Sequence, residues 1–275
     1  MMEFLQSVLR VMDHQMETPR VFGWFHIVCL ALTALVTVLL CFRHKEDSDQ
    51  RVRSVVLITA ILVTLAEIYK QINYSFSYTD GLSFDYQWYA FPFQFCSTPM
   101  YIGLLAGVLP KGKLQQALYS YLATFAVFAG LCVMIYPGDV FVGTLGINIQ
   151  TVICHGSMIC IGVYLFYTGT VKLEHRTIVQ AMLVFACTVS MAVLLNELAY
   201  WTGLLERETF NMFFVSRHCD PSLPVYSLVQ AIVPYPWCLL IYIAGFTAAS
   251  YLILLIGMGI QKMDTARVRK EKIRI

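Results

Sequence analysis

The stretch LGINIQTVICHGSMICIGVYLFY, residues 145–167, decides the fold class of this chain. It contains no Asp, Glu, Lys or Arg, and it exceeds the roughly 20 residues that an apolar helix needs to cross a bilayer. The same stretch carries His155, an ionisable residue of a kind that is costly inside a bilayer and usually functional there. It therefore predicts a membrane-spanning helix and a candidate functional residue within that helix.

The composition extends this interpretation to the whole chain. Of its 275 residues, 58% are hydrophobic and only 13% are charged, whereas soluble domains carry about 25% charged residues. We expect an all-α protein, a polytopic bundle of seven transmembrane helices, with an interfacial segment at residues 1–20, a transmembrane domain at 21–262 and a basic cytoplasmic tail at 263–275. The seven expected spans are residues 21–42, 54–73, 90–109, 115–136, 145–167, 177–202 and 234–260.

The distribution of Lys and Arg predicts how the bundle is oriented. Fourteen of these residues fall in the connections 43–53, 110–114 and 168–176 or from Lys262 onward, and four fall in the remaining connections and the N-terminal segment. Because cytoplasmic loops are enriched in Lys and Arg, we expect the N-terminus outside and the C-terminus in the cytoplasm. The long connection 203–233 then lies outside, as a lid or as a re-entrant segment.

Polar residues of four expected spans lie at similar depths. Helical rise places Glu67 and Cys96 roughly 9 Å below the outer surface and His155 roughly 15 Å below it. Other polar residues of the outer half are Gln94, Asn148, Gln150 and Glu197. The inner half of the expected bundle is almost purely apolar, so the sequence predicts that these groups gather at one site.

A thiol beside an imidazole suggests covalent catalysis. Cys96 would attack an acyl carbonyl and His155 would be its base. Asn148, Gln94 or Gln150 would orient the imidazole or stabilise an oxyanion, and Glu67 would fix the tautomer of the histidine. Glu197 would add polarity, and Arg217 or Arg207 would meet a lipid phosphate.

Each of these residues also has a purely structural explanation. Cys96 can be a packing residue, His155 an interhelical hydrogen-bond donor, Glu67 the ion-pair partner of Lys70, and Glu197 a solvated end residue. Other functions remain open as well. They are a small-molecule or proton transporter with a Glu67, Lys70 and His155 relay, a zinc site, and a non-enzymatic helical partner. No internal repeat supports a transporter, and no dense ligand pattern supports a metal, so we expect none.

Short motifs carry a family resemblance over nearly the whole chain. They are Gln94-Phe95-Cys96, Gln150-Thr151-Val152-Ile153-Cys154-His155-Gly156, Phe210-Asn211-Met212-Phe213-Phe214 and Leu223-Pro224-Val225. The chain resembles the YwaF-type bacterial integral membrane protein family, more weakly the animal transmembrane protein 164 acyltransferase group, and more remotely the androgen-induced-type hydrolases of fatty-acid esters.

The resemblance implies acyl transfer on membrane lipids in a multi-pass protein of the bacterial plasma membrane. By position, the active cysteine and histidine of the animal group would be Cys96 and His155. Phospholipid and an acyl donor would be the partners, with no cofactor and no nucleic acid. Many relatives carry a histidine close before the cysteine, where this chain has Gln94, so a second imidazole role is not implied here.

The predicted orientation can be tested by thiol labelling of intact cells. Cys219, in the 203–233 connection, should react with an impermeant reagent, and cysteines introduced after Lys262 should react only after permeabilisation, because the basic residues divide so unevenly. Labelling of Cys219 only after permeabilisation would reverse the assignment.

Overall fold

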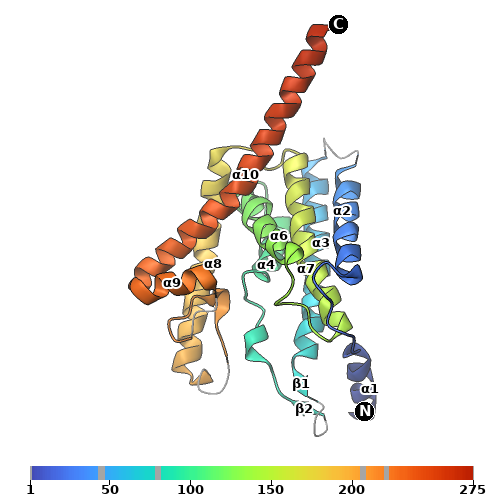
Figure 1. Cartoon of the computed structure of the whole chain (residues 1–275), viewed down its shortest axis with the longest axis vertical. Coiled ribbons are helices and arrows are strands. Elements are labelled where there is room, and N and C mark those ends of the chain that lie inside the picture. The colour runs from blue at the N-terminus through green and yellow to red at the C-terminus, as the bar shows by residue number, and fades with distance from the viewer. Residues whose placement is uncertain (1, 43–46, 78–81, 205–208, 220–222, 275) are drawn as a thin grey trace.

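The computed structural model describes residues 2–42, 47–77, 82–204, 209–219 and 223–274 as a helical bundle (Figure 1). The helices are α1 (Met2–Met12), α2 (Trp24–Cys41), α3 (Asp49–Asn73), α4 (Thr98–Val108), α5 (Lys113–Tyr121), α6 (Val127–Ile135), α7 (Leu145–Tyr167), α8 (His175–Trp201), α9 (Pro224–Ile232) and α10 (Tyr235–Arg274). A π-helical turn, η2 (Leu122–Ala126), joins α5 to α6 into one continuous rod. The remaining elements are β1 (Phe76–Ser77), β2 (Ser83–Phe84), and the short 3₁₀ helices η1 (Trp88–Ala90) and η4 (Met212–Phe214).

Six helical rods in the described part of the chain are long and apolar enough to cross a membrane. They are α2, α3, α5 to α6, α7, α8 and the first 28 residues of α10. These six correspond to predicted spans, and the all-α class is confirmed. The predicted span 90–109 is the exception, because only α4, with 11 residues, is a regular α-helix there. A helix of that length rises about 16 Å, roughly half of a bilayer core.

Prolines explain why the predicted span 90–109 is broken. Phe91, which precedes Pro92, has ψ 134°, as expected because proline disfavours the helical conformation of the residue before it. Pro99 lies in the first turn of α4, where its missing N–H costs no hydrogen bond. Residues 91–97 are therefore non-helical, and they end at Cys96 and Ser97 just before α4 begins.

A second segment without α-helix, residues 209–219, lies against the first and includes η4. The Gln94 side chain accepts a hydrogen bond from Phe213 N (3.1 Å) and donates one to Asn211 O (3.4 Å). The Asn196 side chain of α8 donates to Met212 O (3.0 Å) and accepts from Met212 N (2.8 Å). Since Met212 and Phe213 are fully buried, this segment enters the interior of the bundle, where the side chains of Gln94 and Asn196 bond to its backbone. Whether it is re-entrant in the membrane stays a prediction.

Aromatic rings fill the space between the two segments and the bundle. Phe185 of α8 contacts Phe125 of η2 at a centroid distance of 4.6 Å and Phe95 at 5.2 Å. Phe95 also stacks on Phe213 at 5.6 Å, and Phe246 of α10 packs against Phe95 at 5.3 Å. Because each of these rings removes a large apolar area from its surroundings, they hold the 91–97 and 209–219 segments in place.

Gly162 allows α7 to approach the π-helical turn closely. A Cβ at this position would lie 2.0 Å from Val127 Cγ2 and 2.9 Å from Leu122 O. Small residues at helix crossings let backbones come together in membranes, where packing drives association. The rod α5 to α6 is accordingly the most buried of the six, and α2 is the most peripheral.

The basic connections gather at one end of the bundle. In Figure 1 the start of α3, the turn between α4 and α5, the 168–174 loop and the far end of α10 all lie toward the top. The N-terminal segment and the β1–β2 hairpin lie toward the bottom, where Met16 N donates to Gly143 O (2.7 Å). This arrangement agrees with alternating spans, while the membrane side that each end faces stays a prediction.

Removal of the Asn196 side chain should release the 209–219 segment. Asn196→Ala removes the acceptor of the buried Met212 N and leaves Met212 O only its 3.4 Å bond from Val215 N, so we expect the free energy of unfolding to fall by about 1–3 kcal/mol. Unfolding in mixed micelles followed by tryptophan fluorescence measures this change. Ser190→Ala on the same helix is the control, because Ser190 bonds only to Ala186 O of its own helix. Equal effects of the two substitutions would contradict the assigned role of Asn196.

Candidate functional site

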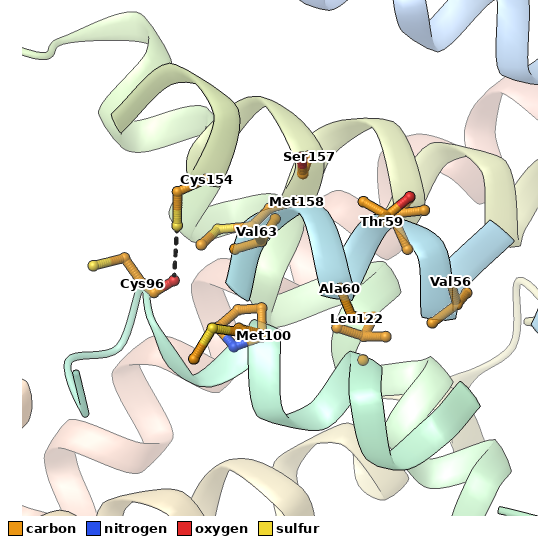
Figure 2. Close-up of a pocket in the computed structure, with 13 residues that line it drawn as sticks. Val56, Thr59, Ala60, Val63, Cys96, Met100, Leu122, Cys154, Ser157 and Met158 are labelled. Atoms are coloured by element: carbon orange, nitrogen blue, oxygen red, sulfur yellow. Dashed lines mark hydrogen bonds between the residues drawn. The ribbon is translucent and has the colours of Figure 1, made fainter. Parts of the chain in front are cut away.

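Cys96 lies beside a small buried cavity at the N-terminal end of α4 (Figure 2). Its backbone oxygen accepts a hydrogen bond from the Cys154 thiol of α7 (3.4 Å), and its own thiol points away from Cys154. The cavity has a volume of about 30 Å³, and Met100 and Ser157 also line it. That volume admits a water molecule and is far too small for an acyl chain.

His155 follows Cys154 on α7 and is also buried. Its Nδ1 lies 2.7 Å from Thr151 O. Because a carbonyl oxygen only accepts, Nδ1 must donate this bond, and the neutral ring then carries an unprotonated Nε2. Nε2 is buried and has no hydrogen-bond partner among the described residues. An unpaired buried nitrogen of this kind calls for a functional or structural explanation.

The other histidine of the expected spans is different in this respect. His26 Nδ1 accepts from Phe22 N (2.9 Å), and Nε2 then donates to Met134 O (2.7 Å). Both of its ring nitrogens are satisfied, so His26 has a structural role. His155 therefore differs from His26: its Nε2 lone pair has no hydrogen-bond donor among the described residues.

Cys96 bonds to Cys154, the neighbour of His155 in the chain, and not to His155 itself. No hydrogen bond joins Cys96 and His155 in the described part of the chain, and His155 does not line the cavity beside Cys96. Consecutive helical residues point about 100° apart. Because Cys154 faces the cavity, His155 projects toward a neighbouring face of α7.

A buried ion pair lies on α3. Lys70 Nζ is 2.7 Å from Glu67 Oε1, and both side chains are largely buried. The sequence suggested Lys70 as a partner for Glu67 or as part of a relay, and the structure contains the ion pair.

Hydrogen bonds extend this ion pair into a network between α3, α7 and the 86–90 region. Glu67 accepts from Gln71 Nε2 (2.8 Å) and from Gln150 Nε2 (3.1 Å). Gln71 also donates to Ala90 O (2.8 Å) and accepts from the Tyr86 hydroxyl (2.6 Å). Glu67 is thus engaged by Lys70 and two amides, and the tautomer role that we expected from it falls to the backbone of Thr151.

The remaining predicted site residues have structural partners. The Asn148 side chain accepts a hydrogen bond from Val142 N (2.9 Å) and donates one to Val142 O (2.8 Å). These two bonds fix the loop before α7. Gln94 holds the 209–219 segment, and Gln150 belongs to the Glu67 network. Arg207, predicted to meet a lipid headgroup, lies outside the described residues.

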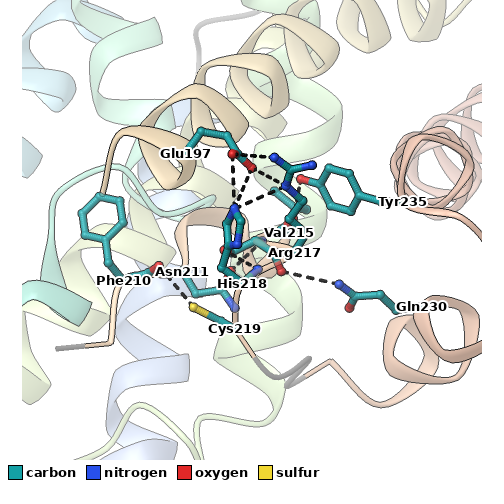
Figure 3. Close-up of polar contacts among 10 residues, drawn as sticks. Glu197, Phe210, Asn211, Val215, Arg217, His218, Cys219, Gln230 and Tyr235 are labelled. Atoms are coloured by element: carbon teal, nitrogen blue, oxygen red, sulfur yellow. Dashed lines mark hydrogen bonds and ion pairs between the residues drawn. The ribbon is translucent and has the colours of Figure 1, made fainter. Parts of the chain in front are cut away.

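Glu197 and Arg217 form a separate cluster at the end of α8 (Figure 3). Arg217 Nε and Nη2 each lie 2.9 Å from a Glu197 oxygen. His218 Nε2 is 3.2 Å from both Glu197 oxygens, and its ring stacks on Tyr200 at 3.7 Å. The cluster therefore fastens the 209–219 segment to α8, and the predicted headgroup contact of Arg217 would have to compete with Glu197.

A larger groove shares Met100 with the small cavity. Its volume is about 410 Å³, within the range of small-ligand sites. Glu67 and Gln71 contribute polar groups to a mainly apolar wall that includes Ile68, Phe84 and Tyr101. Met100 lines both the groove and the Cys96 cavity, so the two spaces are neighbours.

The described residues contain no group of three His, Cys, Asp or Glu side chains placed to hold a metal ion. The expectation that no metal is bound stays a prediction.

These features define a multi-pass α-helical membrane protein with a half-buried cysteine, a buried histidine and a lateral groove. Residues 21–255 match the sequence model of the TMEM164 family. The match spans most of the chain, which therefore belongs to that family. The predicted relationship to transmembrane protein 164 is confirmed, while the bacterial branch stays a prediction. No curated protein and no solved structure matches the chain.

A double-mutant cycle should show that the Glu67–Lys70 pair is coupled. Glu67→Gln leaves Lys70 without its partner inside the bundle, so this single variant should be less stable than Glu67→Gln combined with Lys70→Met. We expect a coupling energy of about 1–3 kcal/mol from unfolding measurements. The control cycle, Asp49→Asn with Lys111→Gln, removes an exposed pair and should give less than about 1 kcal/mol. Similar values for the two cycles would contradict a buried ion pair.

Proposed function

We propose that this protein transfers acyl groups between membrane lipids, with Cys96 as the nucleophile and His155 as the general base. The observation that supports this most directly is the Nε2 of His155, which is unprotonated, buried and without a partner among the residues that the structure describes. Membership of the TMEM164 family supports an acyltransferase-related activity. An imidazole whose other nitrogen is fixed by a backbone carbonyl is preorganised to accept a proton.

The proposed reaction has two balanced halves. His155 Nε2 takes the proton of the Cys96 thiol, and the thiolate attacks the ester carbonyl of a donor lipid. The C–O bond then breaks, the leaving oxygen takes the proton from Nε2, and a thioester remains on Cys96. In the second half an acceptor hydroxyl gives its proton to Nε2 and attacks the thioester. The Cys96 sulfur leaves as thiolate and recovers the proton, and with water as acceptor the result is hydrolysis.

Lys70 supports this chemistry electrostatically. It is a buried cation on α3, the helix that also lines the Cys96 cavity, and a cation near the developing thiolate or oxyanion stabilises negative charge that an apolar interior would disfavour. Glu67 holds Lys70 in position at 2.7 Å. We therefore assign Lys70 to charge stabilisation and Glu67 to positioning.

The groove of about 410 Å³ is the proposed place for the acyl chain. It is mainly apolar and lies beside membrane-spanning helices, where lipid tails are the surrounding medium. A shift of the Met100 side chain would connect it to the Cys96 cavity, because Met100 lines both. Methionine suits this position because its side chain is unbranched and adapts to changes in packing.

Covalent labelling with an alkyne-bearing acyl phospholipid tests the mechanism. The wild-type protein should acquire a hydroxylamine-sensitive label that mass spectrometry maps to Cys96. Cys96→Ala should lose the label, because no other thiol takes its place. His155→Asn should reduce labelling by about 10²-fold or more, since an amide can still donate to Thr151 O but offers no base at the Nε2 position.

Matched variants separate the mechanism from general damage to the site. Cys154→Ala removes a thiol that lines the same cavity and should keep the label, and Met100→Trp should reduce labelling by obstructing the way from the groove. Full labelling of Cys96→Ala would contradict the covalent mechanism. Lipid-coupled proton or solute flux in that same variant would instead favour a transporter.

A further inference from the structure

A polar cavity lies at the basic end of the bundle, far from Cys96. Its volume is about 730 Å³. It is formed where the N-terminal end of α3, the C-terminal end of α4, the N-terminal end of α5 and the 169–170 turn meet. Asp49 at this cavity and Glu67 near Cys96 belong to the same helix, and helical rise separates them by roughly 27 Å. The cavity therefore belongs to a different region from the proposed acyl-transfer site.

Two cations line this cavity. Arg53 Nε donates to Gly107 O (3.3 Å) and Nη2 donates to Val108 O (3.1 Å), which fixes the guanidinium on the wall and leaves three of its five N–H groups for other acceptors. Lys111 pairs with Asp49, but both side chains of that pair are mostly exposed. Such pairs contribute little, so Lys111 can exchange Asp49 for a ligand at small cost.

The start of α5 adds positive potential to the same cavity. Gly112, which lines the cavity, precedes α5 and provides no side-chain cap. The first N–H groups of a helix lack partners within the helix, and its dipole favours an anion at that end. Together with Arg53 and Lys111, and with Asp49 as the opposing charge, the lining favours a negatively charged ligand.

A buried hydroxyl provides the independent sign that a ligand belongs here. Tyr119 lines the cavity and is only 3% exposed, yet its hydroxyl has no hydrogen-bond partner among the described residues. Arg53 and Asp49 are the charges that act on this hydroxyl. Buried hydroxyls are normally paired, so Tyr119 has an unused donor close to a fixed cation.

We propose that this cavity binds a phosphate group through Arg53, Lys111, the start of α5 and the Tyr119 hydroxyl. A phosphate has enough acceptor oxygens to serve all four and carries the charge that the lining favours. The phosphate is supplied either by the headgroup of a membrane lipid or by a soluble phosphate ester. This site is independent of the acyl transfer proposed at Cys96.

Binding to the full-length protein tests the proposal with two kinds of probe. Native mass spectrometry compares retention of phosphatidic acid with that of diacylglycerol, which lacks the phosphate. Titration in detergent compares glycerol 3-phosphate with glycerol. At least one phosphate-bearing probe should bind saturably and its phosphate-free counterpart should not. Binding of the lipid alone identifies a headgroup site, and binding of the soluble ester identifies a site that free phosphate compounds reach.

Variants decide whether the bound probe occupies this cavity. Tyr119→Phe and Lys111→Gln should each weaken binding roughly tenfold, as expected for loss of a hydrogen bond to a charged group. Lys113→Gln is the control because it removes the same charge from a residue that does not line the cavity. Tyr119→Phe removes only an unpaired oxygen, so the protein should remain folded. Cys96→Ala should bind as the wild type does, which separates this site from the proposed function.

Three outcomes would overturn the proposal. They are failure of both phosphate-bearing probes to bind, equal weakening by Lys113→Gln and Lys111→Gln, and unchanged binding in Tyr119→Phe.

Discussion

The need to satisfy backbone polar groups inside a membrane governs this structure. Residues 91–97 and 209–219 contain no α-helix, and inside a bundle their N–H and C=O groups cannot rely on water. The second segment depends on side chains from outside it. Gln94 bonds both Asn211 and Phe213, and Asn196 bonds both polar atoms of Met212. Cys96 therefore lies near the end of the segment whose Gln94 side chain supports residues 209–219, and its own backbone oxygen is bonded by Cys154.

The same constraint accounts for the position of the ion pair. Glu67 and Lys70 occupy one face of α3, but neither is isolated, because Gln71 and Gln150 complete the coordination of the Glu67 carboxylate. Burial of a charged pair is costly and is repaid only when further hydrogen bonds satisfy its oxygens. The network thus brings polarity to the surroundings of Cys96 without opening the bundle to water. A purely apolar cavity would disfavour the thiolate that the proposed reaction requires.

The sequence predicted those features that depend on local pattern. Long apolar runs were sufficient to predict α7, α8 and the other full-length spans. The positions of the Lys and Arg residues predicted that the basic connections cluster at one end of the bundle. The run 90–109 was misleading because mean hydropathy does not register that Pro92 and Pro99 interrupt the helix. The partners of Gln94, Asn148 and Glu197 could not be predicted, since each bond joins residues brought together only by folding. The tautomer of His155 depends on Thr151 O, one turn earlier on its own helix, and not on the carboxylate that its depth suggested.

These bonds indicate which of the two proposed catalytic side chains, Cys96 or His155, has more freedom to move. His155 is held by a regular helix and by its bond to Thr151, so its free nitrogen has a fixed direction. Cys96 lies two residues before α4 begins. The hydrogen bond from Cys154 ends on the backbone oxygen of Cys96, so it does not hold the Cys96 thiol. Any approach between thiol and imidazole must therefore come mainly from Cys96. Since Gln94, two residues earlier, is bonded to the 209–219 segment, the freedom of Cys96 depends on how firmly Glu197 and Arg217 fasten that segment to α8.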